Sequence, residues 1–596
     1  MEDLMNKVRI IFILCLLASL VAIGNIKDPV IPICVSMGDQ SYSEVAYNCI
    51  DNEYLVVWED YRNIPGTQSD IWGQIIKENG EPKGNEFSVC SDSGSQWWPH
   101  VDFDPVSQRY LVVFEDNRRA ATEGWFDNYD VYGALLDVNG KHIPTAASEA
   151  DTCFGISLDS AATHYPDVAW NYQTGAFMVV WADNRNSTPD IYGQIVDSDG
   201  NYLYPADPAV NFPVCDDAAH VQDVPVVVYN NITNEWLAVF AQGDWSTCDI
   251  RAQRIGHDGI LVKKDGAPGA DAFVIKENIG VAADPSQPRA HFNNEYLRKG
   301  NPAVPTTGLN ECLIVWKDNA NQNIDLFAQR LAFFPKLPLL PVMNGARTDS
   351  TVSYYAMAVN LNGDVEDLAV FPVSAAPDFQ NAPDIAYSAL DNEYLVAWPD
   401  SRNWTVTGSD FYCQRLHITA DSAMVFLGAD RQTTTDSLRN IPVDTTIHYE
   451  GGSLVGAAHN SYRNEYLMVY TFKNDADSTM GNIYGRLLTG SIPVKVQEQS
   501  TSTPLCFSLA QNYPNPFNPA TQIAYTLDKP GLVSLEVYTI TGAKIKTLVN
   551  ATQIVGTHTI TWNGSTDFGV SAASGVYIYK MTVNDQSLTR KMLLVR

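Results

Sequence analysis

A sequence motif that predicts two strands joined by a polar loop occurs seven times along this chain of 596 residues. The first copy reads YLVVWED at residues 54–60 and DIWGQI at residues 70–75. The first strand of each later copy begins at residues 110, 177, 236, 312, 394 and 466. Such self-similarity is the signature of a repeat architecture, in which one unit cannot bury its own apolar faces and stacks on its neighbours.

Each copy sits among further strand signals. A short strand such as residues 166–170 (PDVAW) precedes it, and a fourth strand such as residues 86–90 (EFSVC) closes it. Residue pairs that favour tight hairpin turns follow the motif in its first four copies, namely Asn79-Gly80, Asn139-Gly140, Asp199-Gly200 and Asp258-Gly259. Four antiparallel strands per repeat are typical of a propeller blade. The sequence therefore predicts an all-β chain with a seven-bladed β-propeller over residues 29–496.

One aromatic position is constant in the repeats, and its regularity indicates packing between blades. Its occupants are Trp58, Phe114, Trp181, Phe240, Trp316, Trp398 and Tyr470. Residues 30–36 (VIPICVS) resemble a fourth strand without its first three, so we expect them to pair with the last repeat and close the ring. Residues 491–496 (SIPVKV) are the rival closing strand. Residues 332–377 do not repeat, and are either an insertion or a decayed eighth blade around residues 352–364.

The N-terminus reads as a signal peptide over residues 1–24. Lys7 and Arg9 precede an apolar run at residues 10–23, with the small residues Ala22 and Gly24 at its end. About fourteen apolar residues are too few to span a bilayer. We expect Sec-type export to the periplasm and no transmembrane segment in the mature chain.

The net charge and the number of cysteines limit the partners and the disulfides that this chain can have. A net charge of −31 excludes a nucleic-acid-binding surface, which needs Lys and Arg. Cys15 lies in the signal peptide and nine of the ten cysteines remain, an odd number that excludes a complete disulfide framework. Cys34, Cys90 and Cys215 hold matching places one blade apart, which makes them poor partners for one another. Most of the cysteines are expected to be small buried apolar side chains.

The sequence changes character after residue 496. Residues 497–504 (QEQSTSTP) form a polar linker, and residues 505–596 alternate in the manner of a small β-sandwich. The motif Tyr513-Pro514-Asn515-Pro516-Phe517-Asn518-Pro519 and residues 574–579 (SGVYIY) resemble the type A C-terminal sorting domain of type IX secretion. This family, also called the Por secretion tail, shares its immunoglobulin-like fold with hook-capping proteins.

The resemblance to this family implies a role in secretion. Such domains are recognised by the outer-membrane translocon, and are often removed or attached to a surface lipopolysaccharide. It implies a Gram-negative host among the Bacteroidota and their relatives. We therefore expect the protein to be secreted or displayed on the cell surface, with the translocon as one partner.

The loops after the second strands carry a recurring Asp-x-Arg pair, whose arginines are Arg62, Arg118, Arg185 and Arg402. These loops share a face with the segments that join the blades, so the pairs could form a binding ring. The alternative is that each Asp-x-Arg pair is a structural ion pair that holds its own loop in shape, which we call a clasp. Repetition in four blades favours the clasp.

Tryptophans that break the repeat are better candidates for ligand binding. They are Trp97, Trp98, Trp125, Trp245 and Trp404, with Phe126 beside Trp125. Loop tryptophans on a rigid scaffold stack on sugar rings or anchor protein partners. Packing beneath neighbouring loops is equally compatible with their positions.

Signals for catalysis are weak, and no catalytic residue and no metal site is predicted. Asp92, Asp159, Asp216 and Asp217 are candidate axial carboxylates, and His100, His164 and His220 could converge. Residues 197–201 (DSDGN) resemble the start of a calcium loop without its downstream Glu. No cofactor is expected, and Ca²⁺ is the one candidate.

Two functions remain open. The first is a non-catalytic secreted or surface protein that binds glycan or protein through one propeller face. The alternative is a secreted glycosidase or lyase with axial carboxylates. Three or more buried carboxylates around one axial pocket would favour catalysis, and a shallow aromatic surface would favour binding.

Overall fold

The structure is a computed structural model that divides the chain into two compact units, Met1–Val494 and Lys495–Arg596. It describes residues 26 and 29–595 apart from internal gaps, which are 63–68, 120–128, 147, 150–152, 160, 207–209, 244–246, 281–287, 293–295, 298–300, 303–309, 319–324, 334–364, 375, 377–379, 381, 419–423, 428–432, 435–439, 445–455, 474–480, 491–506, 511, 513, 516, 528–530, 540–543, 554–555, 567–570 and 584–585. The predicted signal peptide and linker therefore lie outside the described residues.

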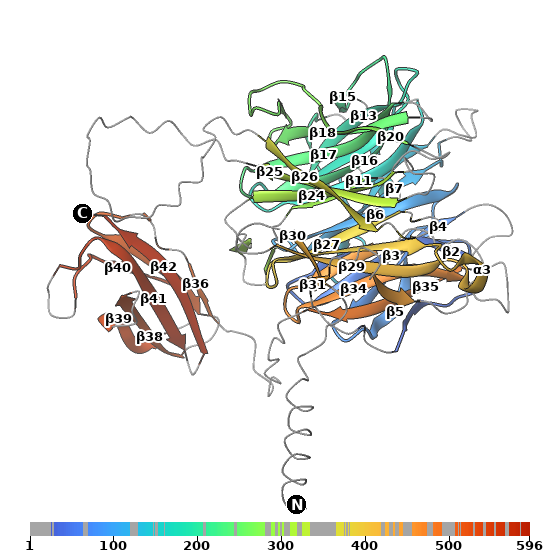
Figure 1. The fold of residues 1–596 in the computed structure, drawn as a ribbon. Coiled ribbons are helices and arrows are strands. Elements are labelled where there is room, and N and C mark those ends of the chain that lie inside the picture. Colours follow the sequence, from blue (N-terminus) through green and yellow to red (C-terminus); the bar gives the residue numbers. More distant parts are fainter. Residues whose placement is uncertain are drawn as a thin grey trace, which may run out of the picture. The chain divides into compact units, whose positions relative to one another are not determined.

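Both units are built of antiparallel strands, so the all-β prediction is confirmed (Figure 1). The described residues include one four-residue helix, α3 (Trp404–Thr407), between two strands of the first unit. No helix among them has the length and apolarity needed to cross a membrane.

The first three repeats each form one sheet. Sheet 1 holds β2 (Gln40–Asn48), β3 (Glu53–Asp60), β4 (Asp70–Lys77) and β5 (Pro82–Cys90). Sheet 2 holds β6 (Gln96–Asp104), β7 (Arg109–Asp116), β8 (Asp130–Asp137), β10 (Cys153–Ser157) and β9 (Ser148–Glu149). Sheet 3 holds β11 (Thr163–Asn171), β12 (Ala176–Asp183) and β13 (Asp190–Asp197), with β14 (Tyr202–Tyr204) and β15 (Phe212–Cys215) both paired to β13.

The next three repeats follow the same plan. Sheet 4 holds β16 (Val221–Asn230), β17 (Glu235–Gly243) and β18 (Thr247–Gly256), with β19 (Leu261–Val262) and β20 (Phe273–Gly280) on β18. Sheet 5 holds β21 (Arg289–Phe292), β24 (Asn310–Asp318), β25 (Asp325–Phe333) and β26 (Val365–Ser374), and the ribbon of β22 (Tyr296–Leu297) and β23 (Asn301–Pro302) separates β21 from β24 in sequence. Sheet 6 holds β27 (Asp384–Ser388), β28 (Glu393–Asp400), β29 (Asp410–Ile418), β30 (Met424–Leu427), β31 (Thr433–Thr434) and β32 (Ile441–Asp444).

Sheet 7 joins the two ends of the repeat array. It holds β33 (Gly456–Asn460), β34 (Glu465–Lys473), β35 (Gly481–Thr489) and the N-terminal β1 (Ile31–Cys34). The register places Ile31 opposite Gly485, which confirms the predicted closing strand. The pairing covers the edge that β35 would otherwise expose. The rival strand at residues 491–496 lies outside the described residues.

The first strands of the sheets form a closed ring. In order, β2, β6, β11, β16, β21 and β27 each contact the next, then β27 contacts β33 and β33 contacts β2. The fold is therefore propeller-like, with the first strand of every sheet nearest the centre. Part of the non-repeating stretch supplies β26, the outer strand of sheet 5, and the candidate eighth blade at residues 352–364 is not among the described residues.

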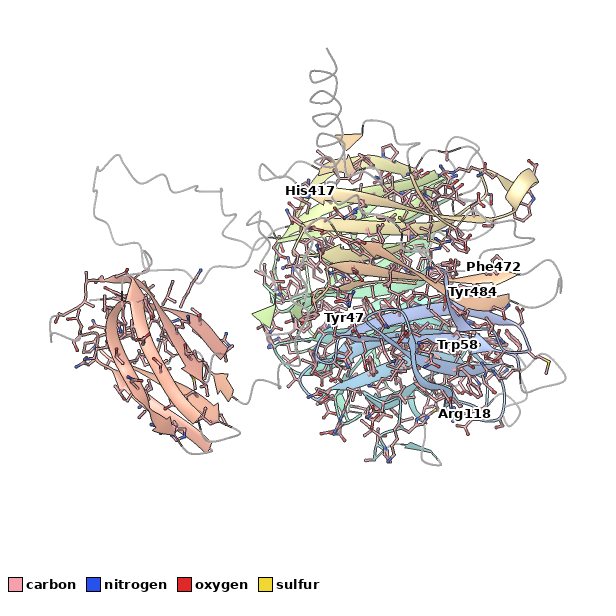
Figure 2. All side chains as sticks on the ribbon, turned by 90° about the horizontal axis from the view of Figure 1, so that it is seen from below. Tyr47, Trp58, Arg118, His417, Phe472 and Tyr484 are labelled. Atoms are coloured by element: carbon pink, nitrogen blue, oxygen red, sulfur yellow. The ribbon has the colours of Figure 1, made fainter. Side chains whose placement is uncertain are left out.

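The core lies between successive sheets. All seven constant aromatics are fully buried, as predicted, and Trp58 is labelled inside its unit in Figure 2. One apolar cluster joins sheets 1 and 2 through residues such as Leu55 and Tyr110, and another joins sheets 7 and 1 through Ile33 and Val56. Stacking of neighbours thus buries the two faces that a single sheet would expose.

The second unit has two antiparallel sheets around one core. The first holds β36 (Phe507–Leu509), β37 (Thr521–Leu527) and β40 (Gly556–Trp562). The second holds β39 (Lys544–Gln553), β38 (Gly531–Thr539), β41 (Gly575–Val583) and β42 (Gln586–Leu594). Ile523 and Trp562 of the first sheet share a buried cluster with Val533 and Tyr579 of the second.

Candidate axial ligand site

Strand register identifies one position that faces the centre of the ring in every sheet. In each sheet, the second strand carries the constant aromatic, and the residue just before that aromatic pairs with this position of the first strand. In sheet 1, Val57 precedes Trp58 and pairs with Glu44. The occupants of this position in sheets 1 to 7 are Glu44, His100, Asp167, Val226, Arg289, Asp384 and Gly456. Five of the seven are ionisable, although the strands around them are mostly apolar. We call these five the charged girdle.

The girdle lines a cavity of about 280 Å³ at the centre of the ring. All seven first strands contribute to its wall, which runs along the strands as far as Cys49, Pro105 and Tyr172. Aromatic side chains such as Tyr47 and Tyr387 share this wall with the charged groups. This axial cavity approaches the size of a small-molecule site and combines apolar faces with convergent polar groups.

Two ion pairs organise the girdle. His100 Nδ1 lies 3.0 Å from Asp167 Oδ1, and Arg289 Nε lies 3.7 Å from Asp384 Oδ1. The four side chains are only 12–15% exposed. Burial lowers the pKa of His100, but the hydrogen bond and charge of Asp167 outweigh it and the pKa is raised. The girdle thus places a basic side chain beside an acidic one at two places around the cavity.

Three acids of the cavity keep their protons more firmly than usual. Burial, with the charge of Asp384, raises the pKa of Glu44 to about 8. Burial also raises the pKa of Asp102 to about 7 and raises that of Asp384. Four carboxyl groups line this one cavity, and at pH 7 the protonated form of Glu44 predominates.

Three of these carboxylates are already used to join sheets. Asp102 Oδ2 accepts a hydrogen bond from Trp170 N, and Asp167 Oδ2 accepts one from Val227 N. Asp384 Oδ2 accepts one from Ala457 N. Each of these distances is 2.7 Å, and each bond reaches the first strand of the next sheet. A structural role for these acids is therefore visible in the geometry.

An aromatic collar lies on the N-terminal side of the girdle. The Tyr42 and Trp98 ring centroids are 4.3 Å apart, and those of Trp98 and Tyr165 are 5.1 Å apart. All three residues have positive φ angles between 51° and 55° at bulges of their strands. Because a bulky residue rarely adopts this conformation, the collar is a strained segment of the kind found at functional sites.

The collar is held by buried glutamates of the preceding sheets. Trp98 N donates to Glu59 Oε1 at 2.9 Å, and Tyr165 N donates to Glu115 Oε1 at 2.7 Å. A second cavity of about 20 Å³ lies between the collar and the girdle and is lined by Trp98, Tyr165, His100 and Arg289 among others. The girdle residues His100 and Arg289 line both cavities.

The tryptophans predicted to bind ligand lie in different parts of the first unit. Trp98 belongs to the collar, whereas the neighbouring Trp97 packs on Tyr129 with ring centroids 4.8 Å apart. Trp404 begins α3 and is 49% exposed. Trp125, Phe126 and Trp245 lie outside the described residues. Convergence on the axis is therefore visible for Trp98.

The predicted arginines are engaged within their own loops. Arg185 Nε and Nη2 lie 2.8 and 2.6 Å from the two oxygens of Asp183, and the guanidinium stacks 4.0 Å from the centroid of Tyr192. Arg62 and Arg402 repeat this bidentate pair, and Arg118 binds Asp116 through Nη2 at 2.6 Å. These contacts are those of a clasp. A role of the arginines in ligand binding stays a prediction.

The carboxylates predicted from the sequence to lie at the axis are found outside the axial cavity. Asp92, Asp159, Asp216 and Asp217 do not line the axial cavity. Asp92 is bound by Arg118 Nη1 at 2.6 Å, and Asp217 by His220 Nδ1 at 2.8 Å. Of the three named histidines, His100 lines the cavity, and His164 lies 3.5 Å from Glu115 Oε2. Residues 197–201 form a hairpin turn in which Asp199 N and Asn201 N donate to Asp197 Oδ1.

Sequence reasoning missed Glu44, Asp102, Asp167, Arg289 and Asp384. A usable signal was present, because an ionisable residue recurs at one place in a strand that is otherwise apolar. The first strand is short and its polar residue changes from repeat to repeat, so it stands out less than the constant aromatic.

The sorting motif fixes the end of the chain. Phe517 is 2% exposed, and its N–H donates to Leu593 O at 3.0 Å while its carbonyl accepts from Val595 N at 3.0 Å. Asn515 Oδ1 accepts from Leu593 N at 2.8 Å. Tyr513 and Pro516 lie outside the described residues. The motif and the terminal strand thus form one structural unit.

Comparison with solved structures gives distant similarities. A fungal alcohol oxidase of the AA5 family in complex with copper has 10% identity and a TM-score of 0.41, over 96% of this chain and 100% of its own. A sialidase from Trypanosoma rangeli has 7% identity and a TM-score of 0.36, over 96% and 88%. An endo-1,5-alpha-L-arabinanase from Thermotoga petrophila RKU-1 has 10% identity and a TM-score of 0.29, over 77% and 99%. Similarities of this size carry no activity over to the chain.

Sequence comparison identifies the C-terminal region. No curated protein matches the chain. Residues 511–595 match the family model described as the secretion system C-terminal sorting domain. The C-terminal region of this chain is therefore a secretion sorting domain, as its motif predicts.

Proposed function

We propose that this chain is an exported glycan-binding protein in which a seven-bladed β-propeller binds a sugar residue in its axial cavity. The C-terminal unit would be an immunoglobulin-like domain that directs the propeller through a type IX-like translocon. The observation that carries the binding proposal is a cavity of about 280 Å³ in which aromatic rings and charged groups share one wall. Sugars present both apolar ring faces and dense hydroxyl groups, and such a wall suits both.

The charge of the cavity selects among sugars. In the cavity, Asp167 is paired with His100, Asp384 is paired with Arg289, and burial raises the pKa of Glu44 to about 8, while the chain as a whole carries −31. The two basic girdle residues are thus already paired with acids, and the negative charge of the chain disfavours uronic acids and other anionic sugars, because like charges repel. A neutral sugar or an amino sugar is the ligand class that fits.

Export rests on the two ends of the sequence. The predicted signal peptide at residues 1–24 would deliver the chain to the periplasm, and the sorting domain at residues 511–595 would carry it across the outer membrane. We place the mature protein in the medium or on the outer surface of a Gram-negative bacterium of the Bacteroidota type. An outward location suits a protein that meets extracellular glycans.

Hydrolysis is the second candidate, and two observations favour it. The four carboxyl groups that line the axial cavity meet the condition given above as favouring catalysis. Glu44 is protonated at neutral pH beside the carboxyl of Asp384, and glycosidases pair a protonated acid with a second carboxylate. Binding is favoured over hydrolysis because Asp102, Asp167 and Asp384 each hold a backbone N–H of the next sheet. Groups committed to such bonds are less available to act on a substrate.

A glycan array probed with residues 25–596 tests the proposal. We expect binding to neutral or amino-sugar glycans and no enrichment among glycans rich in uronic acid. Prolonged incubation of each bound glycan, followed by mass spectrometry, separates the two candidates, because cleavage products would establish hydrolysis. A blank array would contradict the glycan proposal and leave a protein partner as the remaining class of ligand.

A further inference from the structure

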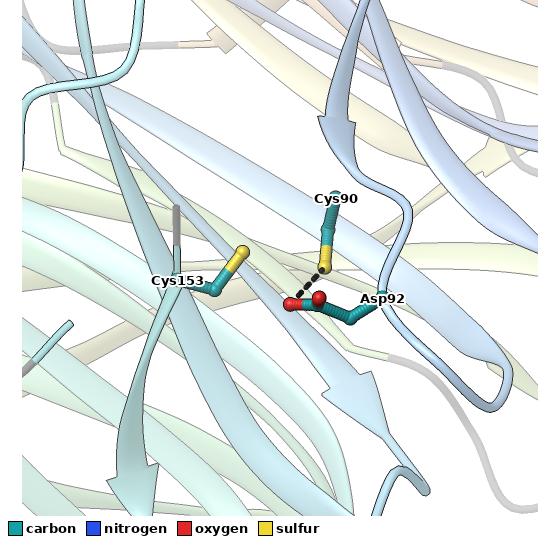
Figure 3. A group of neighbouring side chains, drawn as sticks. All are labelled: Cys90, Asp92 and Cys153. Carbon is teal, nitrogen blue, oxygen red and sulfur yellow. Dashed lines mark hydrogen bonds between the residues drawn. The ribbon is translucent and has the colours of Figure 1, made fainter. Parts of the chain in front are cut away.

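Two cysteines from neighbouring sheets meet in the core of the first unit. Cys90 is the last residue of β5 in sheet 1, and Cys153 is the first residue of β10 in sheet 2. They are 1% and 0% exposed and belong to the same apolar cluster between the sheets. Their sulfur atoms and a carboxylate oxygen of Asp92 all lie within 4.8 Å of one another (Figure 3).

The neighbourhood of this pair disfavours a metal ion. Arg118 Nη1 lies 2.6 Å from Asp92 Oδ2, and Arg118 Nη2 donates to Cys90 Sγ at 3.2 Å. The guanidinium therefore occupies the place in which a cation would be held by Asp92 and Cys90. Arg118 is itself fixed by Asp116 at 2.6 Å and is stacked 4.1 Å from the centroid of Tyr132, so a metal would have to break the clasp of sheet 2.

A bond between the two sulfurs leaves the ion pairs of Arg118 with Asp92 and Asp116 in place, and it removes the hydrogen bond that the Cys90 thiol donates to Asp92 Oδ2 at 4.0 Å. A disulfide needs an S–S distance near 2.05 Å, which side-chain rotation can reach from neighbouring sulfurs when the two residues face each other. Figure 3 shows Cys90 and Cys153 on facing strands with their sulfurs directed into the same space. The Arg118–Asp92 ion pair can remain beside the bond.

We propose that Cys90 and Cys153 form a disulfide in the exported protein and cross-link sheets 1 and 2. The two thiols lose two protons and two electrons, and one S–S bond forms. A periplasmic protein disulfide accepts the electrons by thiol–disulfide exchange and is reduced to two thiols. Export through an oxidising compartment, predicted from residues 1–24, supplies the setting for this reaction.

The reaction belongs to the folding stage. A hydrogen bond with the Cys153 side chain, together with burial, raises the pKa of Cys90 well above its usual value, so the folded thiol is a poor nucleophile. The exchange therefore precedes the packing of β5 against β10. Once formed, the bond closes a loop of about 60 residues and restricts the unfolded chain.

Peptide mapping of the full chain tests the proposal. The protein is purified from the periplasm of an oxidising host, denatured without reductant, alkylated with N-ethylmaleimide and digested. We expect one peptide pair joined through Cys90 and Cys153, lighter than the two free peptides by two hydrogen atoms, and alkylation of both residues only after reduction. The matched variant Cys413→Ser should retain the joined pair, whereas Cys90→Ser should leave Cys153 alkylated.

Two results would overturn the proposal. The first is full alkylation of both cysteines in unreduced protein. The second is one equivalent of zinc in the purified chain that is lost together with alkylation of Cys90 and Cys153. A thermal scan gives an independent readout, in which reduction should lower the midpoint of the wild-type protein by several degrees and leave that of Cys90→Ser unchanged.

Discussion

The clasps in the second-strand loops concentrate buried charge on one aspartate each. Asp183 is fully buried and accepts bonds from Arg185, from the Arg185 backbone and from Trp181 Nε1 at 2.9 Å. Removal of one partner from such a pair leaves the other without compensation. We predict that Asp183→Ala lowers the free energy of unfolding by about 3 kcal/mol, measured by urea denaturation.

A surface ion pair provides the control for this variant. Arg109 Nη1 lies 2.5 Å from Asp199 Oδ1, but Asp199 is 69% exposed. Solvent screens the pair, so Asp199→Ala should cost at most about 1 kcal/mol. Equal losses for the two variants would show that the clasp adds no stability beyond an ordinary surface contact.

Glu44 makes stability depend on pH in a definite direction. Its pKa of about 8 in the folded protein exceeds its usual value of 4.5, so between these values the folded chain binds more protons than the unfolded chain. The contribution of this group is full below pH 4.5 and is lost as the pH rises through 8. The slope is at most about 1.4 kcal/mol per pH unit.

We therefore predict that Glu44→Gln gains stability relative to the wild type as the pH rises from 5 to 8. Urea denaturation of both proteins at pH 5, 6.5 and 8 gives the difference, which should grow across this range. Parallel profiles would mean that Glu44 titrates normally in the folded protein.

At the scale of elements, the hairpin of one sheet rests on a strand of the preceding sheet. Gly140, in the turn after β8, has a φ of +78°, and a Cβ there would lie 2.2 Å from the Phe87 ring of β5. Gly84 has a similar φ of +74°, but a Cβ there would meet no atom within 4 Å. The two glycines thus separate backbone strain from contact between sheets.

We predict that Gly84→Ala costs about 1 kcal/mol, which is the penalty of a positive φ alone. Gly140→Ala should cost about 2 kcal/mol more, because the Phe87 ring must move within a packed interface. Urea denaturation of both variants checks the difference. Equal costs would show that the hairpin of sheet 2 does not press on β5.

The elements that sequence reasoning could predict are those with a repeated pattern. The paired strands such as β3 and β4, the buried aromatics and the closing strand β1 all follow from alternation, turn chemistry and repetition. β26 could not be predicted, because a long non-repeating stretch separates it from β25. The axial cavity could not be predicted either, since it depends on seven strands that are distant in sequence and meet only when the ring closes.

At the scale of the molecule, the two units should be separable in function. Each has its own core, and the family match is confined to residues 511–595. We predict that a chain ending at residue 494 keeps its thermal unfolding transition and its ligand but accumulates in the periplasm of a type IX-secreting host. Fractionation with an antibody against the propeller gives the location. Release of the truncated chain to the medium would contradict the role of the sorting domain.

The central claim is that the ligand binds in the axial cavity and not at the exposed Trp404 of α3. Isothermal titration of the best array glycan against the wild type, Arg289→Ala and Trp404→Ala tests it most directly. Arg289 lines the axial cavity, and Trp404 is 49% exposed on α3. The axial site predicts that Arg289→Ala weakens binding at least tenfold, about 1.4 kcal/mol, and that Trp404→Ala binds as the wild type does. Loss of binding in Trp404→Ala with full affinity in Arg289→Ala would contradict the account.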